Sequence, residues 1–144
     1  MGEQSASSKK IQWKWVSITF VLYVLFYMLP LFVIEPLLKG APTAATVFVG
    51  MWIFGGIIIV AAVAAYFSKD VTIIEPAIAG ALMEILYFFA KSLYRVYTQP
   101  GVQFDIKQGL PFTVVTILIA FALSLVGAWF GERAQKLWKL KSSQ

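Results

Sequence analysis

The sequence of 144 residues contains no cysteine and no histidine. A structural zinc site or an iron–sulfur cluster needs ligands from these side chains, and a disulfide needs two cysteines. Haem held by the usual His or Cys axial ligands is excluded for the same reason. We therefore expect no metal centre and no cofactor.

Charged residues are also scarce, at 13% of the chain, whereas 60% of the residues are hydrophobic. Soluble domains usually have about a quarter of their residues charged. One small core cannot bury so much apolar surface, so lipid is the expected solvent. The net charge of +5 comes from basic residues that cluster beside the hydrophobic runs. Anionic headgroups explain this placement better than nucleic acid does, so the expected partner is a lipid bilayer.

The common patterns of catalysis are missing as well. General acid–base catalysis usually recruits a histidine or a pair of carboxylates, and the chain has no histidine and no second acid near its deepest glutamate. A glycine-rich phosphate loop is not found. The sequence therefore predicts a protein that is not an enzyme.

Four long apolar runs dominate what is present: residues 15–34, 45–67, 71–97 and 110–130. Each has the roughly 20 residues that a helix needs to cross a hydrocarbon layer of about 30 Å. Helices satisfy their own backbone hydrogen bonds in lipid, so these runs are expected to be helical. The prediction is an all-α integral membrane protein, a four-transmembrane-helix bundle that forms a single domain over residues 1–144. Residues 131–144 are expected to prolong the last helix as a basic interfacial tail.

Basic residues indicate the orientation, because they accumulate on the cytoplasmic side of a membrane. With four spans, both termini and the second loop share one side, which holds eight basic residues: Lys9, Lys10, Lys14, Lys69, Arg133, Lys136, Lys139 and Lys141. The opposite side holds four: Lys39, Lys91, Arg95 and Lys107. We therefore expect both termini to be cytoplasmic, and the membrane to be a bacterial inner (cytoplasmic) membrane.

Glu84 is the residue that a membrane span explains least well. It lies eight residues after Pro76, about 12 Å into the layer at helical rise. A charge at that depth is costly, so Glu84 should face protein or water and have a partner. A three-and-four spacing places Tyr87, Lys91 and Arg95 on the same helix face. These four residues form the candidate intramembrane polar site.

Three roles for Glu84 stay open. As a protonated acid it could donate a hydrogen bond between helices, to a backbone carbonyl or to a hydroxyl group of Thr46, Thr113, Thr116 or Ser124. It could instead bind a proton or cation in a pathway across the membrane. A contact with a partner protein is the third interpretation.

Two Glu-Pro pairs, Glu35–Pro36 and Glu75–Pro76, are interpreted as helix starts near the interface. Proline suits the first helical position, and a carboxylate there faces the positive end of the helix dipole.

Small residues predict helix packing, because close approach in lipid relies on short side chains. They are Gly55 and Gly56 in the second run, and Gly127 and Gly131, which form a GxxxG pair, in the fourth.

These features predict a small multi-pass membrane protein that serves as a non-catalytic accessory, assembly or structural subunit of a membrane complex. A membrane-protein partner or self-association is expected through the small-residue and aromatic helix surfaces. The alternative is a small transporter coupled to protons or cations, or a channel-like homo-oligomer, that uses Glu84.

Overall fold

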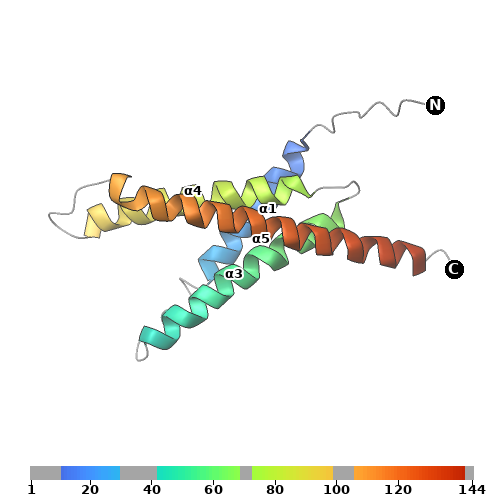
Figure 1. Ribbon diagram of the computed structural model, residues 1–144, viewed down its shortest axis with the longest axis horizontal. Helices are drawn as coiled ribbons and strands as arrows, with labels where there is room; N and C mark the ends of the chain where they lie inside the picture. Colours follow the sequence, from blue (N-terminus) through green and yellow to red (C-terminus); the bar gives the residue numbers. More distant parts are fainter. Residues whose placement is uncertain (1–10, 30–41, 69–72, 99–105, 142–144) are drawn as a thin grey trace.

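The computed structural model describes residues 11–29, 42–68, 73–98 and 106–141. These residues form four helices, α1 (Trp13–Leu29), α3 (Pro42–Phe67), α4 (Ile74–Thr98) and α5 (Ile106–Lys141), shown in Figure 1. The predicted all-α fold is therefore confirmed. Glu35 and Pro36 lie outside the described residues, so their role as a helix start stays a prediction.

Three of the helices, α3, α4 and α5, are long enough and apolar enough to cross a membrane. The described part of α1 is apolar but has 17 residues, and the predicted run 15–34 continues beyond it. The predicted runs 45–67 and 71–97 agree with α3 and α4 to within three residues. Helix α5 starts at Ile106, four residues before the predicted fourth run, and continues to Lys141, so residues 131–141 of the tail prolong the last helix.

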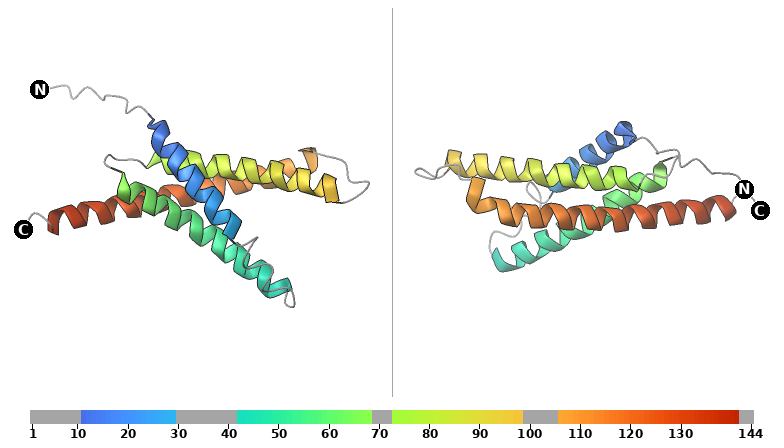
Figure 2. Two further views of the ribbon diagram at one scale, coloured as in Figure 1. Left: turned by 180° about the vertical axis from the view of Figure 1, so that it is seen from behind. Right: turned by 45° about the horizontal axis from the view of Figure 1, so that its top comes forward.

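Pro111 lies inside α5, at its sixth residue, rather than in a first turn. Proline lacks the N–H that would bond to the carbonyl four residues earlier, and its ring presses on that carbonyl. The first turns of α5 are set at an angle to the rest of the helix in Figure 2.

Successive helices run in opposite directions, so α1 and α4 begin at the end of the bundle where α3 and α5 finish (Figures 1 and 2). We call this the closed end, because Gln12, Glu75, Ser68 and Gln135 join the helices there. At the opposite end the first turns of α3 diverge from α4 and α5 (Figure 2). We call this the open end; it contains the start of α3, the end of α4 and the start of α5.

A buried tyrosine joins the helices near the middle of the bundle. The Tyr23 hydroxyl of α1 donates to the Ile57 carbonyl of α3 at 3.2 Å. It also lies 2.8 Å from Ser124 Oγ of α5, and with the tyrosine proton given to Ile57, Ser124 is the donor of this second bond. Gly80 of α4 packs directly against Ser124, where a Cβ would collide with its hydroxyl. All four helices therefore meet at a polar contact that apolar side chains surround.

Helices α3 and α5 approach each other closely along small residues. A Cβ on Gly127 would collide with the Ile58 carbonyl, and one on Gly131 would collide with the Ala62 carbonyl. The two glycines are four residues apart on α5, and the two carbonyls belong to residues four apart on α3. The close contact between the two helices therefore extends over about one helical turn. Ala61, Ala65 and Ala128 are fully buried in the same contact.

At the closed end, side chains satisfy backbone groups that the helix ends leave unpaired. Glu75 is buried in the first turn of α4, and its Oε1 accepts the backbone N–H of Gln12, the residue before α1. Gln135 of α5 donates to the carbonyls of Tyr66 (2.7 Å) and Ser68 at the end of α3. Glu132 is buried nearby, and its Oε1 has no hydrogen-bond partner within the described part of the chain.

Candidate functional site at Glu84

The polar face predicted for α4 points into the bundle over the part whose side chains are described. Ala77 and Gly80 are buried, and Glu84 is half-buried. Ile85 and Leu93, on the opposite face of α4, are exposed. Sequence periodicity therefore located the face that carries Glu84.

The partner of Glu84 is Tyr27 of α1, a residue that the sequence analysis did not propose. The Tyr27 hydroxyl donates to Glu84 Oε1 at 2.5 Å. Tyr27 is buried, and its ring meets the ring of Tyr87 edge to face, with centroids 6.0 Å apart. Ser124, one of the hydroxyl groups considered as a partner for Glu84, bonds to Tyr23 in the structure.

A signal for this partner was present in the first apolar run. Thr19, Tyr23 and Tyr27 repeat every four residues and therefore lie on one face of α1. All three are buried. Thr19 bonds back to the Trp15 carbonyl at 2.8 Å, Tyr23 reaches α3 and α5, and Tyr27 reaches α4. This polar stripe is easily overlooked because the run is otherwise uniformly apolar.

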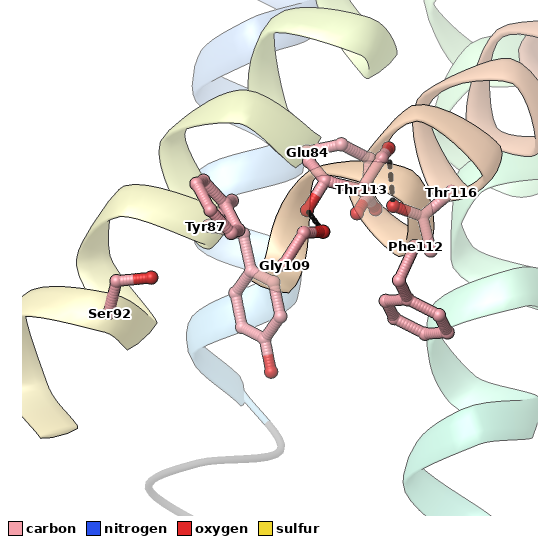
Figure 3. Close-up of a pocket in the computed structure, with 8 residues that line it drawn as sticks. Glu84, Tyr87, Ser92, Gly109, Phe112, Thr113 and Thr116 are labelled. Atoms are coloured by element: carbon pink, nitrogen blue, oxygen red, sulfur yellow. Dashed lines mark hydrogen bonds between the residues drawn. The ribbon is translucent and has the colours of Figure 1, made fainter. Parts of the chain in front are cut away.

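A partly open cleft of about 290 Å³ lies beside Glu84, between α4 and α5. Helix α4 contributes Glu84, Tyr87, Phe88 and Ser92, and α5 contributes Gly109, Phe112, Thr113 and Thr116 (Figure 3). The five residues that bring a side-chain oxygen are Glu84, Tyr87, Ser92, Thr113 and Thr116. Three aromatic rings complete the wall, so the cleft combines an acid, hydroxyl groups and apolar surface.

The two threonines of the cleft use their hydroxyl protons within α5. Thr113 donates to the Gly109 carbonyl at 2.8 Å, and Thr116 donates to the Thr113 carbonyl at 2.9 Å, as the dashed lines in Figure 3 show. A hydroxyl has one proton and two lone pairs. Both threonines can therefore only accept hydrogen bonds from a molecule in the cleft.

The start of α5 shapes the outer part of the cleft. The Phe88 ring lies against Gly109, so closely that a Cβ there would be 2.6 Å from a ring carbon. Pro111 removes one backbone hydrogen bond two residues further on. Gly109 and Pro111 thus lie in the first turns of α5, where this helix begins close to α4.

The other candidate residues are placed as follows. The side chains of Lys91, Arg95 and Thr46 lie outside the described part of the structure, so their predicted place beside Glu84 stays a prediction. Glu75 and Pro76 are buried at the closed end, far along α4 from the cleft.

The predicted packing glycines differ in their surroundings. Gly127 and Gly131 contact α3, and Gly56 lies under the Phe26 ring. A Cβ on Gly55 would have no neighbour within 4 Å among the described residues.

Comparison of the chain with protein-family models, with curated proteins and with solved structures gave no match. The fold and the cleft beside Glu84 are therefore the basis for any assignment of function.

Proposed function

We propose that this protein is a non-catalytic subunit of a membrane complex, inserted as a multi-pass bundle in a bacterial inner membrane with both termini cytoplasmic. The observation that carries the proposal is the open end of the bundle. There the first turns of α3 diverge from the other helices and expose Val47, Phe48, Met51 and Phe54. Met51 is 69% exposed, on a helix that is apolar enough to be embedded in lipid.

The outward face of α3 has the form of a helix-docking surface. Phe48, Met51, Gly55 and Ile59 follow a three-and-four spacing, so they line one face. The three large residues are exposed, and Gly55 lies between them with open space above it. A glycine flanked by large apolar residues lets another helix approach closely, which is how helices associate in lipid. This surface favours a membrane-protein partner over lipid alone.

A substitution at Gly55 gives a sharp test of this docking surface. The tagged protein is expressed at its native level, extracted in a mild detergent, and its co-purifying proteins are quantified. Gly55→Leu should leave the chain folded, since it meets open space, and should reduce the stoichiometric partner at least tenfold. Val114→Leu, on the exposed surface of α5, is the matched control and should retain the partner. Purification of the wild-type chain as a lone species would contradict the proposal.

The cleft beside Glu84 favours a second candidate function, transport coupled to a proton or cation. An acid with a single described partner, beside a partly open cleft that carries hydroxyl groups, suits an ion pathway. Reconstituted liposomes test this candidate through a pH-sensitive dye. A flux that Glu84→Gln abolishes would favour transport over the subunit role, whereas wild-type liposomes that stay tight would exclude it.

A further inference from the structure

The cleft beside Glu84 is rich in hydrogen-bond acceptors. The Glu84 carboxylate accepts from Tyr27, and the hydroxyl groups of Thr113 and Thr116 have given their protons to backbone carbonyls. Three of the five oxygen-bearing side chains of the cleft thus present lone pairs. A molecule that fits this lining must itself donate several hydrogen bonds.

The charge of the cleft indicates what charge a ligand should carry. The Tyr27 hydroxyl donates to Glu84 Oε1 at 2.5 Å, so this carboxyl oxygen acts as an acceptor. Among the described residues Tyr27 is the only hydrogen-bonding or ion-pairing partner of Glu84, so no described Lys or Arg neutralises it. A carboxylate at membrane depth requires a positive neighbour. A ligand that brings a positive charge would supply it.

The size and walls of the cleft argue against a bare metal ion. A volume of about 290 Å³ is near the lower end of the range for small-molecule sites. The rings of Tyr87, Phe88 and Phe112 line it together with the polar groups. Aromatic faces attract cations and also pack against apolar groups. From Glu84 to Ser92 the cleft extends eight residues along α4, about 12 Å at helical rise, toward the open end.

We propose that this cleft binds a protonated amine that carries a small apolar body. The ammonium group lies at Glu84 and donates hydrogen bonds to its carboxylate and to Thr113 and Thr116. The apolar body lies between Phe88 and Phe112. Tyr27 acts as a positioning residue that holds Glu84 from the opposite helix. Binding of this ligand goes beyond the proposed subunit role and does not require a partner protein or a flux.

The test is a titration of the full-length protein in phosphatidylcholine nanodiscs with 4-fluorobenzylammonium, followed by fluorine NMR. We expect saturable binding. The neutral analogue 4-fluorobenzyl alcohol has nearly the same shape but no charge and fewer donors, and it should bind at least tenfold more weakly. Glu84→Gln should weaken binding of the ammonium at least tenfold, and Thr116→Val should weaken it a few-fold, because it removes one acceptor and little volume.

Glu75→Gln is the matched control, since it makes the same change on the same helix outside the cleft. It should bind the ammonium like the wild type. A second arm replaces part of the lipid with phosphatidylethanolamine, whose headgroup is a primary amine. Displacement of the fluorinated probe by this lipid identifies a lipid headgroup as the source of the amine, and no displacement identifies a free amine.

Three results would overturn the proposal: binding that does not saturate, equal binding of the ammonium and the alcohol, or unchanged affinity in Glu84→Gln and Thr116→Val. If the ammonium binds as expected but no partner co-purifies, the subunit role fails and the amine site stands. If a partner co-purifies but the ammonium does not bind, the amine site fails and the subunit role stands.

Discussion

At the closed end of the bundle, polar side chains hold the backbone of neighbouring helices, whereas at the open end they line a cleft. Glu75 and Gln135 each bond to backbone groups of another helix. Glu84, on the same helix as Glu75, meets one hydroxyl and faces the space between α4 and α5. Two glutamates nine residues apart therefore have different surroundings: Glu75 accepts from the backbone at a helix start, and Glu84 lines the cleft.

The comparison makes a general point about membrane bundles. Apolar burial cannot drive helix association in lipid, so close packing and hydrogen bonds must hold the helices together. In this protein both are concentrated near Tyr23 and toward the closed end. The open end can then diverge without loss of the fold. Substitutions at the two ends should accordingly have unequal effects on stability and on binding.

The largest effect on stability is expected from Gly131→Leu. Its side chain would meet the Ala62 backbone of α3, which cannot move aside as a flexible side chain could. Overpacking usually costs about 1–3 kcal/mol, and a backbone collision belongs at the upper end of that range. Unfolding in a denaturing detergent, followed by tryptophan fluorescence, measures the loss. Gly50→Leu, which meets open space, is the control and should stay within about 0.5 kcal/mol of the wild type.

A smaller loss is expected from Tyr23→Phe, which removes a hydroxyl that bonds to Ile57 and Ser124. Interhelical hydrogen bonds in membranes are worth about 0.6 kcal/mol on average and up to about 1.7 kcal/mol. Because two bonds are lost in a fully buried place, we expect about 1–2 kcal/mol. A double-mutant cycle with Ser124→Ala checks the assignment. Strictly additive losses in that cycle would show that the two hydroxyls do not interact.

Gln135→Leu should cost about 0.5–1.5 kcal/mol, since it leaves the last carbonyls of α3 without their donor. The loss should be local. Hydrogen exchange at the end of α3 should accelerate, and exchange near Tyr23 should be unchanged. Uniform acceleration across all four helices would mean that the closed end is not a separate unit.

The smallest change in stability is expected from Glu84→Gln, at less than about 0.5 kcal/mol. The glutamine carbonyl oxygen can still accept from Tyr27, and the cleft leaves room for the amide group. The same unfolding assay measures it, with the wild-type protein beside it. A loss as large as that of Tyr23→Phe would place Glu84 among the residues that hold the fold, and the contrast between the two ends would disappear.

Sequence patterns predicted much of this architecture. Helix α3 and helix α4 follow from run length and hydrophobicity, and the inward face of α4 follows from the spacing that contains Gly80 and Glu84. Length, hydrophobicity and spacing are properties of a single helix, so the sequence of that helix alone is enough to predict them. The start of α5 was missed because Gly109 and Pro111 indicate a boundary, although the helix continues through both.

The pairing between helices could not be predicted in the same way. Tyr27 meets Glu84 only because α1 crosses α4 at one particular place and angle, which depend on packing along the whole contact. The same applies to Gly127 and Gly131: their spacing predicted a packing surface but did not say that α3 of the same chain covers it. Gln135 was read as part of a basic tail, and its role as a cap depends on where α3 ends.

The most direct test is to locate the start of α1, the end of α4 and the end of α5 relative to the membrane. Because the chain has no cysteine, single variants Lys14→Cys, Tyr97→Cys and Lys141→Cys report their positions without background. In intact cells, a maleimide that cannot cross membranes should label Tyr97→Cys at once, and should label Lys14→Cys and Lys141→Cys only after permeabilisation. Labelling of Tyr97→Cys and Lys141→Cys from the same face would mean that α5 does not cross the bilayer, and would contradict the account of Glu84 as an intramembrane acid beside a ligand cleft.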